Sequence, residues 1–197
     1  EFRRVLFRSA PDRAPHLTVF SSSWKDRFTI PPEWVDASHR GQIEAFDGRI
    51  PVGVLNWLWH RLEWPPAEWL THREYDVTHS LHPLILPARG AAAVVTIHDL
   101  NFLANPDFTQ AEIRRDYPVL AAGHARRADQ IIVPSDHTAR EVMRQFSIAR
   151  ERITVCPPGA PPWARRPVPG SGTDGYLLFF GTLEPRKNVG KIGRAHV

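Results

Sequence analysis

From residue 75 onward, short apolar runs alternate with segments of helical spacing. Four runs of four to six residues predict strands, because they are rich in β-branched side chains and too short for typical helices. Strand and helix patterns that alternate in this way predict an α/β fold with a parallel sheet. The expected strands are Tyr75–His79, Ala92–Ile97, Gln130–Pro134 and Ile153–Cys156.

Local signals predict where two helices of this region begin. Thr109 followed by Glu112 forms a capping box, which opens a helix that carries Tyr117 and His124 on its apolar face. Ser135 is a suitable N-cap for a second helix. The apolar face of that second helix recurs at helical spacing in Ala139, Val142, Met143 and Phe146.

The chain before residue 75 is less regular. His16–Ser22 predicts a short strand, and Thr29–Arg49, punctuated by proline and glycine, predicts a loop. One helix is expected over 54–62, and Pro65 and Pro66, which follow it, should end it. Its apolar stripe consists of Leu55, Leu58, Trp59 and Leu62.

The two ends differ from the rest of the chain. Residues 1–9 (EFRRVLFRS) and 191–197 (KIGRAHV) resemble translations of a short-read sequencing adapter in opposite orientations. We therefore expect both segments to be foreign to the protein and exclude them from reasoning about the fold. The natural start and end of the protein then lie outside this sequence.

Composition points to an ordinary globular domain once the ends are set aside. The whole chain has a net charge of +4, but removing five basic and one acidic residue with the two ends leaves 20 of each sign. A neutral chain gives no electrostatic reason to expect a nucleic-acid partner. Cys156 is the single cysteine, which is consistent with a reducing, cytoplasmic compartment.

The spacing of proline and glycine suggests a division into two domains. Residues 10–156 form the expected first domain, which is incomplete at its start, and residues 157–175 are rich in proline, glycine and arginine and predict a linker. Residues 176–190 begin a second domain, of which only the first strand, Tyr176–Phe180, is present, followed by a turn into a helix.

Four motifs, in series, resemble the retaining glycosyltransferases of family 4, also called group 1. They occur in the order and at the spacing of that family, and they cover more than half of the chain. The motifs are VVTIHDLNFL (94–103), ARRADQIIVPSDHTAREV (125–142), ERITVCPPGAP (151–161) and FGTLEPRKN (180–188).

The resemblance implies a GT-B architecture, in which two Rossmann-like domains face each other across a cleft. Residues 10–156 would be the N-terminal domain, which holds mainly the acceptor. His98 and Asp99 directly follow the strand that ends at Ile97, and ligands of open parallel sheets bind at the carboxyl ends of strands. Because the matching histidine of the family contacts the donor sugar, the resemblance implies a catalytic role for His98 and Asp99. A histidine that only bonds backbone at a strand end is the alternative.

Arg186 and Lys187 lie between the last expected strand and a helix start. Two cations beside a helix N-terminus suit a diphosphate, because the backbone amides there already favour anions. The resemblance implies that Lys187, with Arg186, holds the diphosphate of the donor, so that no metal or other cofactor is required. The alternative is a solvated basic turn.

Histidine and tryptophan supply two further hypotheses. His79 and His82, with His72 and the pair His98–Asp99, could form a metal site, although H-x-x-H at the end of a strand is a poor match to helical zinc motifs. The tryptophans suit core packing, an acceptor platform or a peripheral contact with a membrane. They are Trp57, Trp59, Trp64 and Trp69.

Taken together, the resemblance implies transfer of a hexose from a nucleoside-diphosphate sugar to a hydroxyl of a glycan or lipid-linked acceptor, with retention at the anomeric carbon. The expected location is the cytoplasm or the inner face of the membrane. The Glu-x7-Glu element of the family would lie beyond Gly190, so this chain by itself is expected to be inactive. A non-catalytic α/β module that binds a sugar or nucleotide, and a metal-dependent hydrolase built on the histidines, remain as alternatives.

Overall fold

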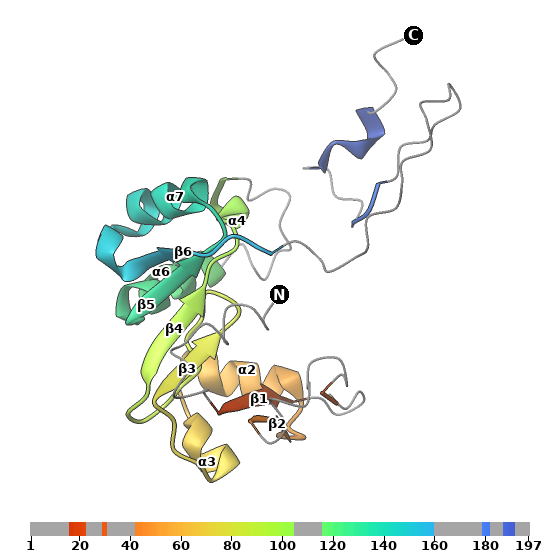
Figure 1. Cartoon of the computed structure of the whole chain (residues 1–197), viewed down its shortest axis with the longest axis vertical. Coiled ribbons are helices and arrows are strands. Elements are labelled where there is room, and N and C mark those ends of the chain that lie inside the picture. Colours follow the sequence, from red (N-terminus) through yellow and green to blue (C-terminus); the bar gives the residue numbers. More distant parts are fainter. Residues whose placement is uncertain are drawn as a thin grey trace.

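The computed structural model has an α/β fold with parallel sheets of Rossmann-like type, as the sequence pattern predicts. Strands and helices alternate along its main body, and a C-terminal segment stands apart from that body (Figure 1). The residues that the structure describes are 16–22, 29–30, 42–104, 116–159, 179–181 and 187–191.

Four strands form the larger sheet, in the order β3-β4-β5-β6, which is also their order along the chain. All three of its ladders are parallel. The four strands predicted after residue 75 are thus confirmed, with boundaries that shift by at most two residues. Their bounds are β3 Val77–Ser80, β4 Ala92–Thr96, β5 Gln130–Val133 and β6 Ile153–Val155.

Helices α6 (Tyr117–Arg127) and α7 (Asp136–Phe146) form a core with this sheet. Ala121 and Ala125 of α6 are fully buried, and their small side chains allow close approach of the helix backbone to its neighbours. The core cluster consists of Val95, Ile97, Leu100, Ala121, Ala125, Ala128, Ile131, Val133, Ala139, Val142, Phe146, Ile148 and Ile153.

The start of α7 follows the sequence signal. Ser135 has extended backbone, and its hydroxyl accepts a hydrogen bond from the amide of Thr138, which confirms the predicted N-cap. The helix ends at Phe146, where Ser147 adopts the left-handed conformation with φ 56°. The capping box predicted for the preceding helix, Thr109 to Glu112, lies outside the described residues.

Strands β1 (Leu17–Ser21) and β2 (Ile43–Asp47) form a second, two-stranded parallel sheet. This corrects one prediction, since β2 lies in the stretch 29–49 that was expected to be a loop, and it divides the described part of the expected first domain (10–156) into two sheets. The sheet is divided because β1 hydrogen-bonds to β2 and not to β3. Phe20 of β1 stacks on Phe46 of β2 at 5.6 Å between ring centroids, which joins the pair through side chains as well.

Helix α2 (Val52–Arg61) confirms the helix predicted over 54–62 and packs against β1, with 5.2 Å between the ring centroids of Trp59 and Phe20. Leu55 and Trp59 are buried, but Leu62 is 57% exposed, because the helix ends one residue earlier. The indole of Trp59 donates to the carbonyl of Pro65 at 2.9 Å.

Three short elements were not predicted. Helix α3 (Ala67–Thr71) starts directly after Pro65 and Pro66, a pair whose sequence signal predicts only the end of the preceding helix. Proline suits the first turn of a helix as well, since its missing amide has no partner there. The other two elements are α4 (Asn101–Ala104) and the 3₁₀ helix η3 (Arg150–Arg152).

The described part of the C-terminal segment differs from the predicted buried strand. Phe179 and Phe180 lie outside any strand, and Phe180 is 98% exposed. A strand becomes buried only against neighbouring strands or helices, and this segment stands away from the larger sheet (Figure 1). The 3₁₀ helix η5 (Val189–Lys191) follows, and residues 176–178 and 182–186 are outside the described ranges.

Candidate functional site

The carboxyl ends of β3 to β6 form one edge of the larger sheet. The chain leaves this edge at Leu81 after β3, at Ile97 and His98 after β4, at Ser135 after β5 and at Cys156 after β6. Such edges are where open parallel sheets bind ligands, because the loops there combine free backbone groups with side chains from several strands.

His98 lies on this edge, as predicted. Ile97 is fully buried, whereas the next residue, His98, is exposed. The Nε2 atom of His98 is 3.2 Å from the carbonyl oxygen of Leu81. Since a carbonyl can only accept, this contact places a proton on Nε2 and leaves Nδ1 of the neutral ring as an acceptor. This contact is the bond to backbone that the alternative, structural interpretation of His98 expects. It also orients a ring that remains accessible.

The backbone of His98 is linked to α7. The hydroxyl of Thr138 donates to the carbonyl oxygen of His98 at 3.5 Å, and Thr138 is itself buried in the first turn of that helix. Because Ser135 caps the same turn, the loop after β4 and the start of α7 are held together. Sequence reasoning found Ser135 but missed this link, which joins residues 40 positions apart.

Asp99 begins the loop that leads into α4. Its Oδ1 atom accepts a hydrogen bond from the amide of Asn101 at 2.9 Å, so the carboxylate shapes the start of the short helix. Burial, and then the negative charge of Asp99, raise the pKa of the Tyr117 hydroxyl on α6. Asp99 therefore shapes the loop next to His98 but does not share the hydrogen bond of the His98 ring.

Lys187 is not brought to His98. Lys187 is exposed and lies on the C-terminal segment that stands away from the sheet, while Arg186 is outside the described residues (Figure 1). A Cβ atom added to Gly181 would lie 2.9 Å from Nζ of Lys187, and Gly181 has φ +146°. A glycine at this position thus permits both the backbone turn and the close approach of the ammonium group.

Three histidines, from α2, α6 and the loop after β3, form a cluster that the sequence pattern did not predict. The rings of His60 on α2 and His82 after β3 meet edge to face, with centroids 6.1 Å apart. Nδ1 of His82 accepts from the amide of Leu84 at 3.2 Å. Burial is the main cause that lowers the pKa of His82, and it lowers the pKa of His60 to about 4, with help from the neighbouring histidines.

The third histidine of the cluster, His124 on α6, is 3% exposed. Its Nδ1 atom accepts from the amide of Ile85 at 3.0 Å. Burial and then the charge of Arg127 lower its pKa, against an opposing effect of Glu63. Arg127 and Glu63 are themselves paired at 2.6 Å. The cluster is therefore neutral and joins α2, α6 and the loop after β3.

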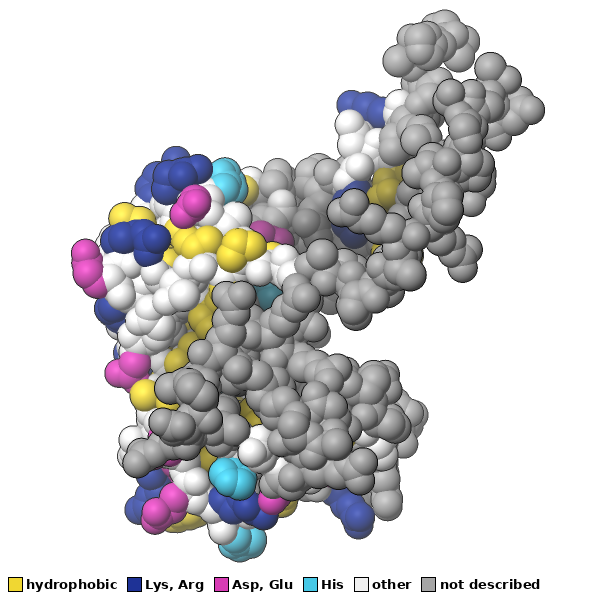
Figure 2. All heavy atoms as spheres, in the orientation of Figure 1, with side chains coloured by type: hydrophobic (Ala, Val, Ile, Leu, Met, Phe, Trp, Pro, Cys, Tyr) yellow, Lys and Arg dark blue, Asp and Glu magenta, His cyan; other side chains and the backbone are white. Residues whose placement is uncertain are grey.

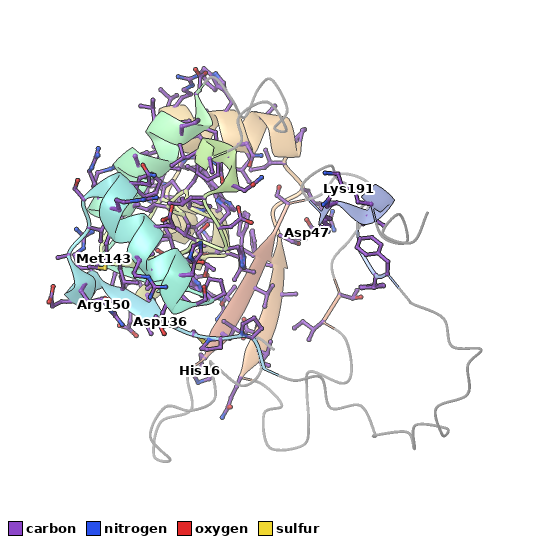
Figure 3. All side chains as sticks on the ribbon, turned by 90° about the horizontal axis from the view of Figure 1, so that it is seen from above. His16, Asp47, Asp136, Met143, Arg150 and Lys191 are labelled. Carbon is purple, nitrogen blue, oxygen red and sulfur yellow. The ribbon has the colours of Figure 1, made fainter. Side chains whose placement is uncertain are left out.

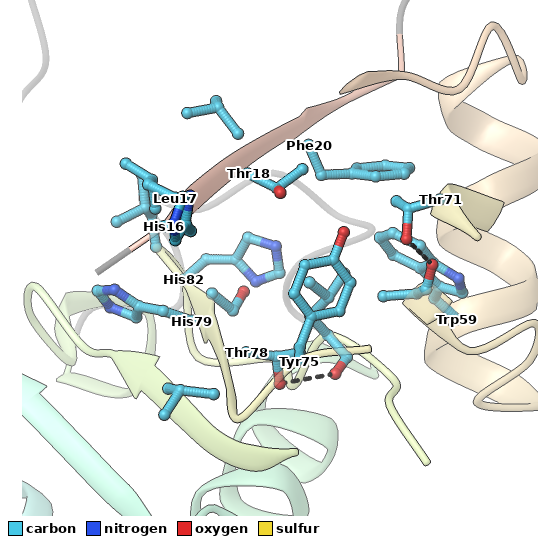
Figure 4. Close-up of a pocket in the computed structure, with 16 residues that line it drawn as sticks. His16, Leu17, Thr18, Phe20, Trp59, Thr71, Tyr75, Thr78, His79 and His82 are labelled. Carbon is cyan, nitrogen blue, oxygen red and sulfur yellow. Dashed lines mark hydrogen bonds between the residues drawn. The ribbon is translucent and has the colours of Figure 1, made fainter. Parts of the chain in front are cut away.

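A cavity of about 430 Å³ separates β1 from β3 (Figure 4). Its walls are mainly apolar and include Phe20, Trp59 and Leu86. His79 also lines it, and Nε2 of His79 is 2.8 Å from Oγ1 of Thr96. The cavity thus lies between the two sheets. Figure 3 shows the β1–β2 pair beside the main body, with His16 and Asp47 at opposite ends of the pair.

The histidines proposed as metal ligands are not gathered into one centre. His79, His82 and His98 each have a different partner: Thr96, the amide of Leu84 and the carbonyl of Leu81. Across the described ranges, no group of three or more His, Cys, Asp or Glu side chains is arranged to hold a metal ion.

Surface charge, helix length and exposed tryptophans are the properties relevant to the partners expected from the sequence. Among the described side chains visible in Figure 2, acidic and basic groups are interspersed. Among the helices in the described part of the chain, none has the length and apolar character needed to cross a membrane. Trp57, Trp64 and Trp69 are about half exposed, whereas Trp59 is buried.

Comparison with known families decides what kind of domain this is. The sequence profile of Glycosyltransferase Family 4 matches residues 6–162, most of the chain. The chain belongs to this family. The family 4 match spans both sheets, α2, α6 and α7, and it includes His98 and Asp99.

A curated relative extends the comparison. The family 4 chain is 27% identical over 174 residues to the O-antigen chain mannosyltransferase B of Escherichia coli. The match covers 81% of this chain and 44% of the relative, so the chain spans less than half of the relative's length. No solved structure matches the chain significantly.

Proposed function

We propose that the full-length protein transfers a hexose from a nucleoside-diphosphate sugar to a hydroxyl of a glycan or lipid-linked acceptor, with retention at the anomeric carbon. Membership of Glycosyltransferase Family 4 supports this proposal most strongly. The mannosyltransferase relative favours mannose as the hexose and a polysaccharide chain as the acceptor. A GT-B arrangement, with a second domain that binds the nucleotide, belongs to the same proposal.

In the proposed reaction, the acceptor oxygen forms a bond to the anomeric carbon while the bond from that carbon to the diphosphate oxygen breaks. The diphosphate leaves with the electron pair of the broken bond, and its freed oxygen takes the proton that the acceptor hydroxyl loses. His98, exposed at the carboxyl edge of the sheet, contacts the donor sugar through Nδ1 or through Nε2 after its bond to Leu81 opens. Asp99 holds the loop that presents the ring.

The charge that develops on the leaving diphosphate is assigned to Arg186 and Lys187. Cations at this position stabilise a leaving diphosphate in the way a metal ion would, so the proposed mechanism requires no metal. The exposure of Lys187, whose ammonium lies close to the backbone of Gly181, is compatible with this assignment. The proposed location is the cytoplasm, at the inner face of the membrane when the acceptor is lipid-linked.

The experiment supplies the full-length protein with a panel of nucleoside-diphosphate hexoses, with and without a mannose-containing acceptor. Release of nucleoside diphosphate that depends on acceptor, together with a glycosylated product, is the expected result. NMR of the product then reports whether the anomeric configuration is retained. Binding of sugar or nucleotide without any turnover would contradict the proposal and identify a non-catalytic module.

A further inference from the structure

A second concave site lies beside the short helix α3. It has a volume of about 610 Å³, within the range of small-molecule sites. Neither His98 nor Asp99 lines it. Its walls are formed by Glu68, Trp69, His72, Arg73, Glu74, Tyr75, Arg89 and Gly90.

Its position in the fold is opposite the carboxyl edge. Glu74 and Tyr75 precede β3, while Arg89 and Gly90 precede β4. His98 follows β4, so the whole strand separates this cleft from the proposed transfer site. At about 3.3 Å per residue, the eight steps from Gly90 to His98 span at most roughly 26 Å.

An aromatic platform forms one wall. Trp69 is 49% exposed, and its ring meets that of Trp64 edge to face at 6.1 Å between centroids. The guanidinium of Arg89 lies 5.2 Å from the centroid of Trp69. A half-exposed indole with a guanidinium over its ring offers apolar surface and hydrogen-bond donors side by side.

The platform is fixed in place before any ligand binds. The backbone amide of Arg89 donates to Oε1 of Glu68 at 2.9 Å, and the amide of Ala67 donates to the carbonyl of Pro87 at 2.8 Å. These two bonds tie α3 to the segment before β4. Preorganisation of this kind reduces the entropy lost on binding.

The charges of the cleft favour a neutral polar ligand. Two carboxylates, Glu68 and Glu74, stand against two guanidiniums, Arg73 and Arg89, and Arg73 is further paired with Glu44 of β2 at 2.7 Å. Such a balance gives no excess positive charge for a phosphate or an anionic membrane. An exposed indole beside hydrogen-bonding groups suits a pyranose, which has an apolar C–H face and hydroxyls around its edge.

We propose that this cleft binds pyranose units of the acceptor glycan, at a distance from the hydroxyl that is glycosylated. The inference rests on the proposed function for the identity of the glycan. Trp69 supplies the stacking surface, and the guanidinium of Arg89 supplies hydrogen bonds to ring hydroxyls. The site thus holds the body of a long acceptor chain while its end lies at the carboxyl edge of the sheet.

The test measures binding of mannotetraose to the 197-residue chain by saturation-transfer NMR and tryptophan fluorescence. Trp69→Ala is expected to weaken binding at least about fivefold, the loss typical of a stacked aromatic pair. Trp57→Ala is the matched control, because Trp57 is 58% exposed on α2 and does not line the cleft. Near-ultraviolet circular dichroism and a thermal melt verify that both variants are folded.

Equal binding by the two variants, or no saturable binding by the unsubstituted chain, would overturn the inference. Vesicles of anionic phospholipid form a third arm, and a Trp69-dependent binding of vesicles in place of mannotetraose would overturn it as well. Because no arm requires turnover, failure here leaves the proposed transfer reaction untouched. Conversely, binding of mannotetraose through Trp69 without any sugar transfer would support the subsite and contradict the proposed function.

Discussion

The Nδ1 atom of His124 accepts a hydrogen bond from the backbone amide of Ile85 at 3.0 Å. A protonated imidazole has no acceptor at this atom, so protonation replaces the bond by an encounter between two N–H groups. His82 makes an equivalent bond with the amide of Leu84. The cluster with His60 thus joins α2, α6 and the loop after β3 only in its neutral form.

This arrangement predicts loss of stability in acid. The folded-state pKa values of His60, His82 and His124 are lowered from 6.5, so below that pH the unfolded chain binds more protons than the folded one. The contribution of the cluster to the free energy of unfolding is therefore complete above pH 6.5 and decreases as the pH falls toward 4. Allowing for solvent screening of the half-buried His60, the expected loss is on the order of 1–2 kcal/mol.

Urea unfolding between pH 7.5 and 4.5 checks this prediction. His124→Asn should flatten part of the acid limb, because the Asn oxygen accepts from Ile85 without titrating. His137→Asn, on the exposed start of α7, is the control and should retain the full pH dependence. A free energy of unfolding that stays constant over this range would show that the cluster does not control acid stability.

The Ser135 cap predicts a second stability effect. Ser135→Ala removes the acceptor for the amide of Thr138 and should lower the free energy of unfolding by about 1 kcal/mol. Ser135→Asp keeps an acceptor and should remain close to the original chain. Urea titrations at neutral pH measure both. If the alanine variant unfolds at the same urea concentration as the aspartate variant, the hydroxyl contributes nothing to the helix.

Lys187 is expected to act on the donor. In the full-length protein, Lys187→Ala should lower kcat/KM for the nucleotide sugar about 10- to 100-fold, the value of one charge-assisted hydrogen bond. Arg144→Ala removes an exposed cation near the end of α7, where it pairs with Glu141, and should change kcat/KM little. Steady-state kinetics with varied donor compare the two, and equal losses would indicate a nonspecific charge effect.

The absence of a metal requirement is a separate prediction. If Arg186 and Lys187 balance the diphosphate charge, the full-length enzyme should keep its turnover in excess EDTA. The measurement is the initial rate before and after dialysis against the chelator. Loss of activity that one divalent ion restores would assign the charge compensation to a bound metal.

Local patterns were sufficient to predict the larger sheet and α7. The strands from β3 to β6 are short, apolar and separated by helices, and Ser135 is a local cap, so neighbouring residues alone specify these elements. Strand β2 was missed because its sequence, IEAFD, alternates polar with apolar residues only briefly and lies between glycines. Helix α3 was missed because it has only five residues and begins after prolines.

The site was predicted in part. The position of His98 follows from the end of β4, and that required only the strand pattern. Its bond to Leu81, the link from Thr138 and the cluster of His60, His82 and His124 join residues far apart in sequence. A single sequence has no periodicity that reports such contacts, so they emerge only from the fold.

The role of His98 is tested most directly by comparing His98→Ala with Ile97→Ala in the full-length protein. His98 is exposed, so its removal should change the free energy of unfolding by about 0.5 kcal/mol or less, while turnover falls about 10²- to 10⁴-fold. Ile97 is fully buried, so its truncation should cost roughly 2–5 kcal/mol of stability. Thermal melts and donor turnover are measured on the same samples. If His98→Ala destabilises the protein as much as Ile97→Ala, or leaves turnover intact, His98 is a structural residue and the proposed site is wrong.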